Sequence, residues 1–232
     1  MKKLYKSIIT ILTNVLVFHY DGYGNEVVIL WKWIVFYSMA FILGILIAMF
    51  QWPFWIAIAV LIFASFIMIG DVLFTLYGTT NINRVEKFII KKKKEPIYAF
   101  IYSQGFGKKE DQIIAIDAIL KKYKQQHIAH YYRCIQEYLK DNLELALDEA
   151  NKIGKEPLMG YSKALVLAKM GKENEALSNT PSKPWMQEAI RAAIAISKND
   201  ADAFEKHANN AIHSTRGIQR LSIIYSFNQM RK

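Results

Sequence analysis

Cysteine and the common catalytic motifs are scarce or missing in this 232-residue chain. The one cysteine, Cys134, excludes an intramolecular disulfide framework and makes a reducing compartment the simpler expectation. The sequence contains no G-x-S-x-G, H-E-x-x-H or G-x-G-x-x-G motif, which mark hydrolase, metalloprotease and dinucleotide sites. Acid pairs such as Glu144 and Asp148 are i, i+4 neighbours on a solvated helix face, not an acid and base across a cleft. We therefore expect no enzymatic activity, no catalytic residues and no cofactor.

Potential metal ligands are equally few. His127, His130 and Cys134 fall at i, i+3 and i+7, on one face of one expected helix. A zinc site usually needs three or four protein ligands, and no second pair with ligand-like spacing is present. Ordinary packing and surface roles are the favoured interpretation, so the sequence predicts no metal site.

Charge is nearly absent from two long stretches, Trp33–Phe50 and Pro53–Tyr77. At a rise of about 1.5 Å per residue, each is long enough to cross a hydrocarbon core about 30 Å thick. Only Gln51 and Trp52 separate them, and Pro53 suits the first turn of a helix because its missing N–H costs nothing there. The sequence therefore predicts a transmembrane helical hairpin over residues 27–78.

Basic residues exceed acidic ones, giving a formal net charge of +10. Lysines precede the hairpin, a basic run follows it, and the tip carries no charge, so the positive-inside rule places both termini in the cytosol. We expect a multi-pass protein of the bacterial inner membrane. Anionic lipid headgroups explain the basic excess more directly than nucleic acid does, and no nucleic-acid partner is expected. The residues expected to bind lipid are Lys91, Lys92, Lys93 and Lys94, and a solvated helix end, which the helix dipole also favours, is the equal alternative for this run.

The first twenty residues carry a broad apolar face interrupted by polar residues. This pattern predicts an amphipathic helix over residues 1–20, lying in the cytosolic interface. The alternative is a short third spanning segment, which would place Asp21–Glu26 outside and contradict the side assigned to Lys91–Lys94.

Two features lie inside the expected hairpin. Asp71 is the only acid in either apolar run, and counting from the turn places it level with Lys32, near the cytosolic interface. A structural Lys32–Asp71 pair is favoured over ion transport, because one carboxylate near an interface makes no relay. A small-xxx-small stripe allows close helix approach, and packing within the hairpin is favoured over a homodimer because the second helix is covalently at hand. Its members are Ala40, Gly44 and Ala48.

Helical periodicity continues after the hairpin. Residues 79–125 read as basic juxtamembrane helices, and residues 126–232 contain an internal repeat. Displacements of 30 and then 28 residues align small residues where two helices would cross, turn residues that end a first helix, and alanines in a return helix. These sets are Cys134, Ala164 and Ala192; Asp141, Gly171 and Asn199; and Ala146 and Ala176.

The stretch Ala164–Leu177 resembles the core of a tetratricopeptide repeat, with its small residue, its glycine and its alanine in order. The resemblance covers Gln126–Arg231 and implies an α-solenoid. The chain departs from the family at Gly160, where a tryptophan-like residue is expected, and in its period, which is shorter than about 34 residues. The expected class is all-α: a two-helix transmembrane hairpin followed by a cytosolic α-solenoid. The alternative for the soluble part is a nonrepetitive helical bundle.

These observations predict a membrane-anchored adaptor or accessory protein in bacterial cell-envelope assembly or secretion. Its helical-repeat domain would bind or stabilise a membrane protein or a cytosolic peptide. Core packing is the alternative role for the apolar members of the expected partner-binding surface. Two other functions stay open: an accessory transporter subunit, and immunity against a membrane-active peptide, each acting through the hairpin and Asp71. The residues expected to bind the partner are Tyr131, Ile135, Tyr138, Tyr161, Leu165 and Lys169.

Overall fold

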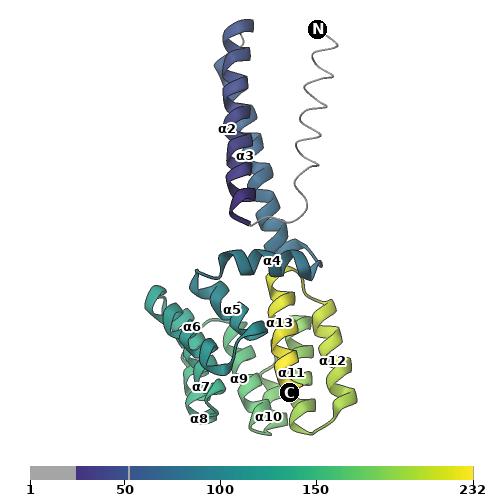
Figure 1. Ribbon diagram of the computed structural model, residues 1–232. Helices are drawn as coiled ribbons and strands as arrows, with labels where there is room; N and C mark the ends of the chain where they lie inside the picture. The colour runs from purple at the N-terminus through teal and green to yellow at the C-terminus, as the bar shows by residue number, and fades with distance from the viewer. Residues whose placement is uncertain (1–24, 52, 232) are drawn as a thin grey trace. The chain divides into compact units, whose positions relative to one another are not determined.

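The computed structural model describes residues 25–51 and 53–231, and all regular secondary structure in them is helical (Figure 1). The all-α prediction is confirmed for this part of the chain. The molecule divides into two compact units between Ile69 and Gly70, inside helix α3. The interfacial helix expected over residues 1–20 lies outside the described residues.

The first unit contains helix α2 (Asn25–Phe50) and most of α3 (Phe54–Leu73). Large apolar side chains such as Phe41 and Phe63 are exposed on both helices. Among the described residues, one helix, Ile58–Gly78, is long and apolar enough to cross a membrane, with a mean hydropathy of 2.4. The apolar helix Ile34–Phe50 is shorter. The two-helix membrane hairpin stays a prediction.

The second unit begins with the end of α3, a π-helical turn η1 (Phe74–Gly78) and helix α4 (Ile82–Lys92). Asn81 caps α4, because its side chain accepts a hydrogen bond from the backbone N–H of Arg84. Helix α5 (Pro96–Phe106) starts with proline in its first turn, where the missing N–H is tolerated, and α6 (Lys109–Lys122) follows.

Seven further helices complete the second unit. Six of them form three pairs whose members pack against each other and against the next pair, as Figure 1 shows. The pairs are α7 (Gln126–Leu139) with α8 (Leu143–Asn151), α9 (Leu158–Lys169) with α10 (Glu173–Ser178), and α11 (Pro184–Ser197) with α12 (Ala201–His213). The last helix is α13 (Gly217–Met230).

The predicted turn positions are confirmed by the backbone. Asp141, Gly171 and Asn199 each follow the first helix of a pair and adopt positive φ angles of 69°, 75° and 58°. This left-handed conformation ends a helix and reverses the chain, and glycine adopts it without steric cost. The small residues predicted at the helix crossings, Cys134, Ala164 and Ala192, are all buried.

The second unit also closes on itself. Helix α13 packs against α12 and returns to α4, α5 and η1, the first elements of the unit. Leu221 of α13 is fully buried in one apolar cluster with Val85 and Ile116. In an open solenoid each repeat contacts only its neighbours, so this long-range contact distinguishes the observed domain from the expected one.

Candidate functional site: a cavity between the first helices

A cavity of about 640 Å³ lies inside the second unit. Its wall is built mainly from α5, from the first helix of each of the three pairs (α7, α9 and α11), and from α13. The structure brings all six residues of the expected partner-binding surface to this wall. They are Tyr131, Ile135, Tyr138, Tyr161, Leu165 and Lys169. Their role in binding stays a prediction, but their shared position is a feature of the fold.

The third pair explains why space remains at the centre. The displacement of 28 residues aligns Tyr161, Leu165 and Lys169 with three much smaller residues of α11, which also line the cavity. These are Ala189, Ala193 and Ser197. Sequence reasoning did not identify them, although the same displacement would have found them. Large side chains on α7 and α9 therefore face small ones on α11, and the difference leaves a cavity.

Helices α5 and α13 contribute a polar part of the wall that no repeat pattern indicated. Gln104 of α5 accepts a hydrogen bond from Ser222 (Oγ to Oε1, 3.0 Å) and donates one to Ser226 (Nε2 to Oγ, 3.5 Å). Gln229 donates to the backbone carbonyl of Gln104 at 2.8 Å. The residues are more than 100 positions apart in sequence, so only the return of α13 to α5 brings them together.

The tyrosines of the wall are packed through their rings and keep their hydroxyl protons. Tyr161 meets Trp185 edge to face, with 5.1 Å between ring centroids. Burial raises the pKa of Tyr131 and Tyr161 far above the usual value of 10, and raises that of Tyr138 to about 12. The wall therefore presents neutral hydroxyl groups throughout the physiological pH range.

Lys169 is the only charged residue among the described residues that line the cavity. Its Nζ lies 2.8 Å from the Asp141 carboxylate, donates to the backbone carbonyl of Tyr138 at 3.2 Å and lies over the Tyr138 ring. The Lys169 charge is therefore paired with Asp141 at the edge of the site. No other charged side chain of the described residues lines the cavity, so its interior is uncharged.

Two of the three residues at metal-ligand spacing have other contacts or surroundings in the structure. Burial raises the pKa of the Cys134 thiol to about 12, so this sulfur is not a thiolate at neutral pH. The Nδ1 atom of His130 lies 2.8 Å from the carboxylate of Glu149, which ties α7 to α8. Among the described residues, no group of three or more histidine, cysteine or acidic side chains could hold a metal ion.

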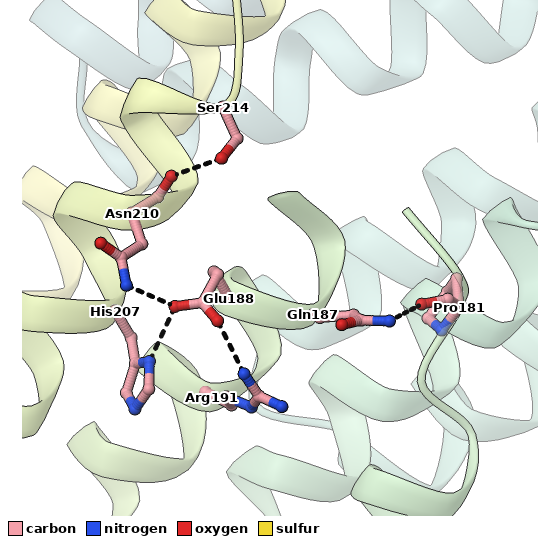
Figure 2. A network of polar contacts seen from close by, with 7 residues as sticks. All are labelled: Pro181, Gln187, Glu188, Arg191, His207, Asn210 and Ser214. Atoms are coloured by element: carbon pink, nitrogen blue, oxygen red, sulfur yellow. Dashed lines mark hydrogen bonds and ion pairs between the residues drawn. The ribbon is translucent and has the colours of Figure 1, made fainter. Parts of the chain in front are cut away.

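A second carboxylate–histidine contact joins α11 to α12 on the outside of the cavity. Glu188 accepts hydrogen bonds from Asn210 at 2.9 Å and from Arg191 at 2.7 Å, and His207 Nδ1 lies 2.9 Å from its carboxylate. Figure 2 shows the three side chains around Glu188. Partial burial of Glu188 acts to raise its pKa, but these hydrogen bonds outweigh burial and lower it. The carboxylate is therefore a structural anion that fixes the helix carrying Ala189 and Ala193.

The basic residues next to the apolar helices have several roles. Arg84 donates to the Asp71 carboxylate at 2.5 Å and to the Thr75 hydroxyl at 2.9 Å, linking α4 to α3 and η1. Sequence reasoning paired Asp71 with Lys32 and missed Arg84; the Lys32 side chain lies outside the described residues. Of the expected lipid-binding residues, Lys92, Lys93 and Lys94 are exposed and Lys91 is half-buried.

Comparison with known proteins gives no family assignment. No protein-family model, curated protein or solved structure matches this chain significantly.

Proposed function

We propose that this protein is a membrane-anchored, non-enzymatic adaptor that receives part of a partner protein in the cavity of its helical domain. The partner is a membrane protein or a cytosolic peptide that takes part in the assembly of the bacterial cell envelope or in secretion. The single observation that carries the proposal is the convergence of the six expected partner-binding residues on one cavity. A pocket with apolar and aromatic walls and a few polar groups is the usual form of a binding site.

The anchoring part of the proposal has separate support. The two successive apolar helices and the flanking lysines favour a hairpin with both termini in the cytosol. The four exposed or half-exposed residues Lys91–Lys94 would contact anionic headgroups, each contributing about 1 kcal/mol. Apart from its chain neighbours and its own helix backbone, nothing described lies within 4 Å of a Cβ position at Gly44, which favours a homodimer contact through Ala40, Gly44 and Ala48.

The chemistry of the described residues favours this proposal over transport through the hairpin. Asp71, the acid that a transport function would use, lies in an ion pair with Arg84. We therefore assign Asp71 a structural role at the end of α3.

Site-specific photo-crosslinking in intact cells tests the adaptor function. A photo-reactive phenylalanine analogue replaces Leu165 in the cavity wall or, as the control, the half-exposed Leu177 of α10. We expect a discrete crosslinked partner from position 165 and none from position 177. Adding Tyr161→Ala should reduce the crosslink. The absence of a specific crosslink at position 165, or the same products at both positions, would contradict the proposal.

A further inference from the structure

The neutrality of the cavity restricts what can occupy it. No acidic residue lines it among the described residues, and Lys169 is held at its edge by Asp141. Transfer of a charged group from water into such a site is costly unless the site supplies a counter-ion. The occupant is therefore uncharged over the part that enters the cavity.

One polar group in the wall has no partner. The Ser162 side chain is 4% exposed, and its Oγ forms no hydrogen bond within the described structure. A buried hydroxyl without a partner destabilises the fold, because it loses its hydrogen bond to water and gains none in return. Ser162 lines the cavity, but its Oγ has almost no accessible surface, so a group that enters the cavity can supply the missing hydrogen bond only after the side chain turns toward it.

The polar part of the wall points to the same kind of occupant. Gln104, Ser222 and Gln229 bond to one another but keep further donor and acceptor positions, and Gln112, 3% exposed, also lines the cavity. A hydrocarbon chain would cover these groups without bonding to them. A polypeptide carries one N–H and one C=O per residue and can pair with them. In a helix those groups are already bonded internally, so the segment must be extended.

We propose that the cavity binds a short, uncharged, apolar segment of a polypeptide in extended conformation. Its side chains pack against the rings of Tyr131, Tyr161 and Trp185, and one of its main-chain groups pairs with the Ser162 hydroxyl. This inference rests on the proposed adaptor function and names the chemistry of the partner segment. It also assigns Ser162, which the repeat pattern did not single out, to the binding site.

The test uses the full chain in lipid nanodiscs and an array of short peptides of random sequence with blocked ends. We expect the bound peptides to be uncharged and apolar. In the best binder, one Asp or Lys at a central position should abolish binding, and palmitate should not displace the peptide. Binding of charged peptides with equal affinity, displacement by palmitate, or no binding to any peptide would overturn the proposal.

Main-chain recognition is tested by methylating each backbone nitrogen of the best binder in turn. Loss of one hydrogen bond should weaken binding about five- to tenfold at the positions that contact the wall. Ser162→Ala should remove the main-chain contact made by its hydroxyl and lower affinity by a similar factor. The variant should not destabilise the fold, because its Oγ has no partner there. Ser178→Ala of α10 is the control, since that hydroxyl lies outside the cavity and donates to the carbonyl of Glu175.

Uniform affinity across the methylated series, together with no effect of Ser162→Ala, would overturn the main-chain contact. The crosslink from position 165 in cells distinguishes this inference from the adaptor function. If the crosslink forms but charged peptides or palmitate bind equally well, the adaptor function stands and the stated ligand class is wrong. If the crosslink is absent, the adaptor function itself is wrong.

Discussion

At the scale of single residues, the cavity depends on lining side chains that stay neutral or have their charge paired. The three tyrosines stay neutral, Cys134 stays a thiol, and Lys169 is paired at the edge. Each of these states follows from burial or from one neighbouring group. The charged groups of the fold act elsewhere, mainly between neighbouring helices, and two of them give direct tests.

Glu188 should stabilise the fold only above acidic pH. Its pKa is lowered from 4.5 in the folded protein, so its contribution is present above pH 4.5 and is lost as the pH falls through the folded value. Glu188→Gln should reduce stability at neutral pH by about 1–3 kcal/mol, because it weakens hydrogen bonds to a charged group. Thermal unfolding of both proteins between neutral and acidic pH measures the difference, which should shrink below pH 4.5.

The control for this prediction is Glu175→Gln on the exposed surface of α10. It should leave stability within about 0.5 kcal/mol of the parent. A difference between Glu188→Gln and the parent that is constant across the pH range would show that the network does not depend on the carboxylate charge.

The Asp71–Arg84 pair should contribute little to stability. Both side chains are substantially exposed, 47% and 40%, and exposed ion pairs are worth about 0–1 kcal/mol. Asp71→Asn should therefore leave unfolding and crosslinking from position 165 nearly unchanged. The double variant Asp71→Arg with Arg84→Asp should behave like the parent. Complete loss of function in Asp71→Asn at normal membrane abundance would instead favour a transport role.

At the scale of elements, the contact between η1 and the start of α13 joins the first and last parts of the second unit. The backbone N–H of Gly217 donates to the carbonyl of Thr79 at 2.7 Å, and Gly217 has a φ of 56°. A Cβ atom at this position would overlap the carbonyl oxygen of Leu76. Because α13 also lines the cavity, this glycine helps to determine whether α13 can pack against η1 and complete the cavity wall.

Gly217→Ala should be much more destabilising than Gly171→Ala. Both glycines have positive φ, but nothing lies within 4 Å of a Cβ at Gly171. Gly171→Ala should cost about 1–2 kcal/mol from the left-handed backbone alone. Gly217→Ala adds a clash with backbone and should cost clearly more, with faster proteolysis of α13. Chemical denaturation of both variants measures the costs, and equal values would show that η1 and α13 do not meet as described.

At the scale of the whole molecule, the second unit carries its own core. Its apolar clusters are formed by residues after Gly70, including Phe204 and Leu221, both almost completely buried. A fragment of residues 70–232 should therefore fold without the rest of the chain into a helical protein that unfolds cooperatively. Circular dichroism during thermal unfolding tests this. A fragment that is soluble but unfolded would show that the domain needs the first unit.

The topology of the chain is tested in intact cells. Gln51→Cys and Ser214→Cys are each placed in a Cys134→Ala background and exposed to a membrane-impermeant thiol reagent. Only the cysteine at position 51 should react, since the positive-inside rule places the loop between the apolar runs outside and the helical domain in the cytosol. Reaction at position 214 would contradict the cytosolic assignment.

The sequence alone determined the features that depend on local chemistry. The all-α class, the repeat displacements, the turns at Asp141, Gly171 and Asn199, and the small buried residues at the helix crossings all follow from periodicity and steric size. The same alignment predicted that six residues lie on one face of the first helices, and in the structure all six line one cavity.

Tertiary structure alone decided how that face is closed. The repeat alignment covers α7 to α12 and says nothing about α5 and α13, whose contact joins Gln104 to Ser222 across more than 100 residues. No local pattern predicts such a pairing, because it depends on the summed curvature of the intervening helices. Tertiary structure also determines that the Ser162 hydroxyl has no hydrogen-bond partner and that Asp71 pairs with Arg84. Each requires knowing which groups a distant part of the chain supplies or fails to supply.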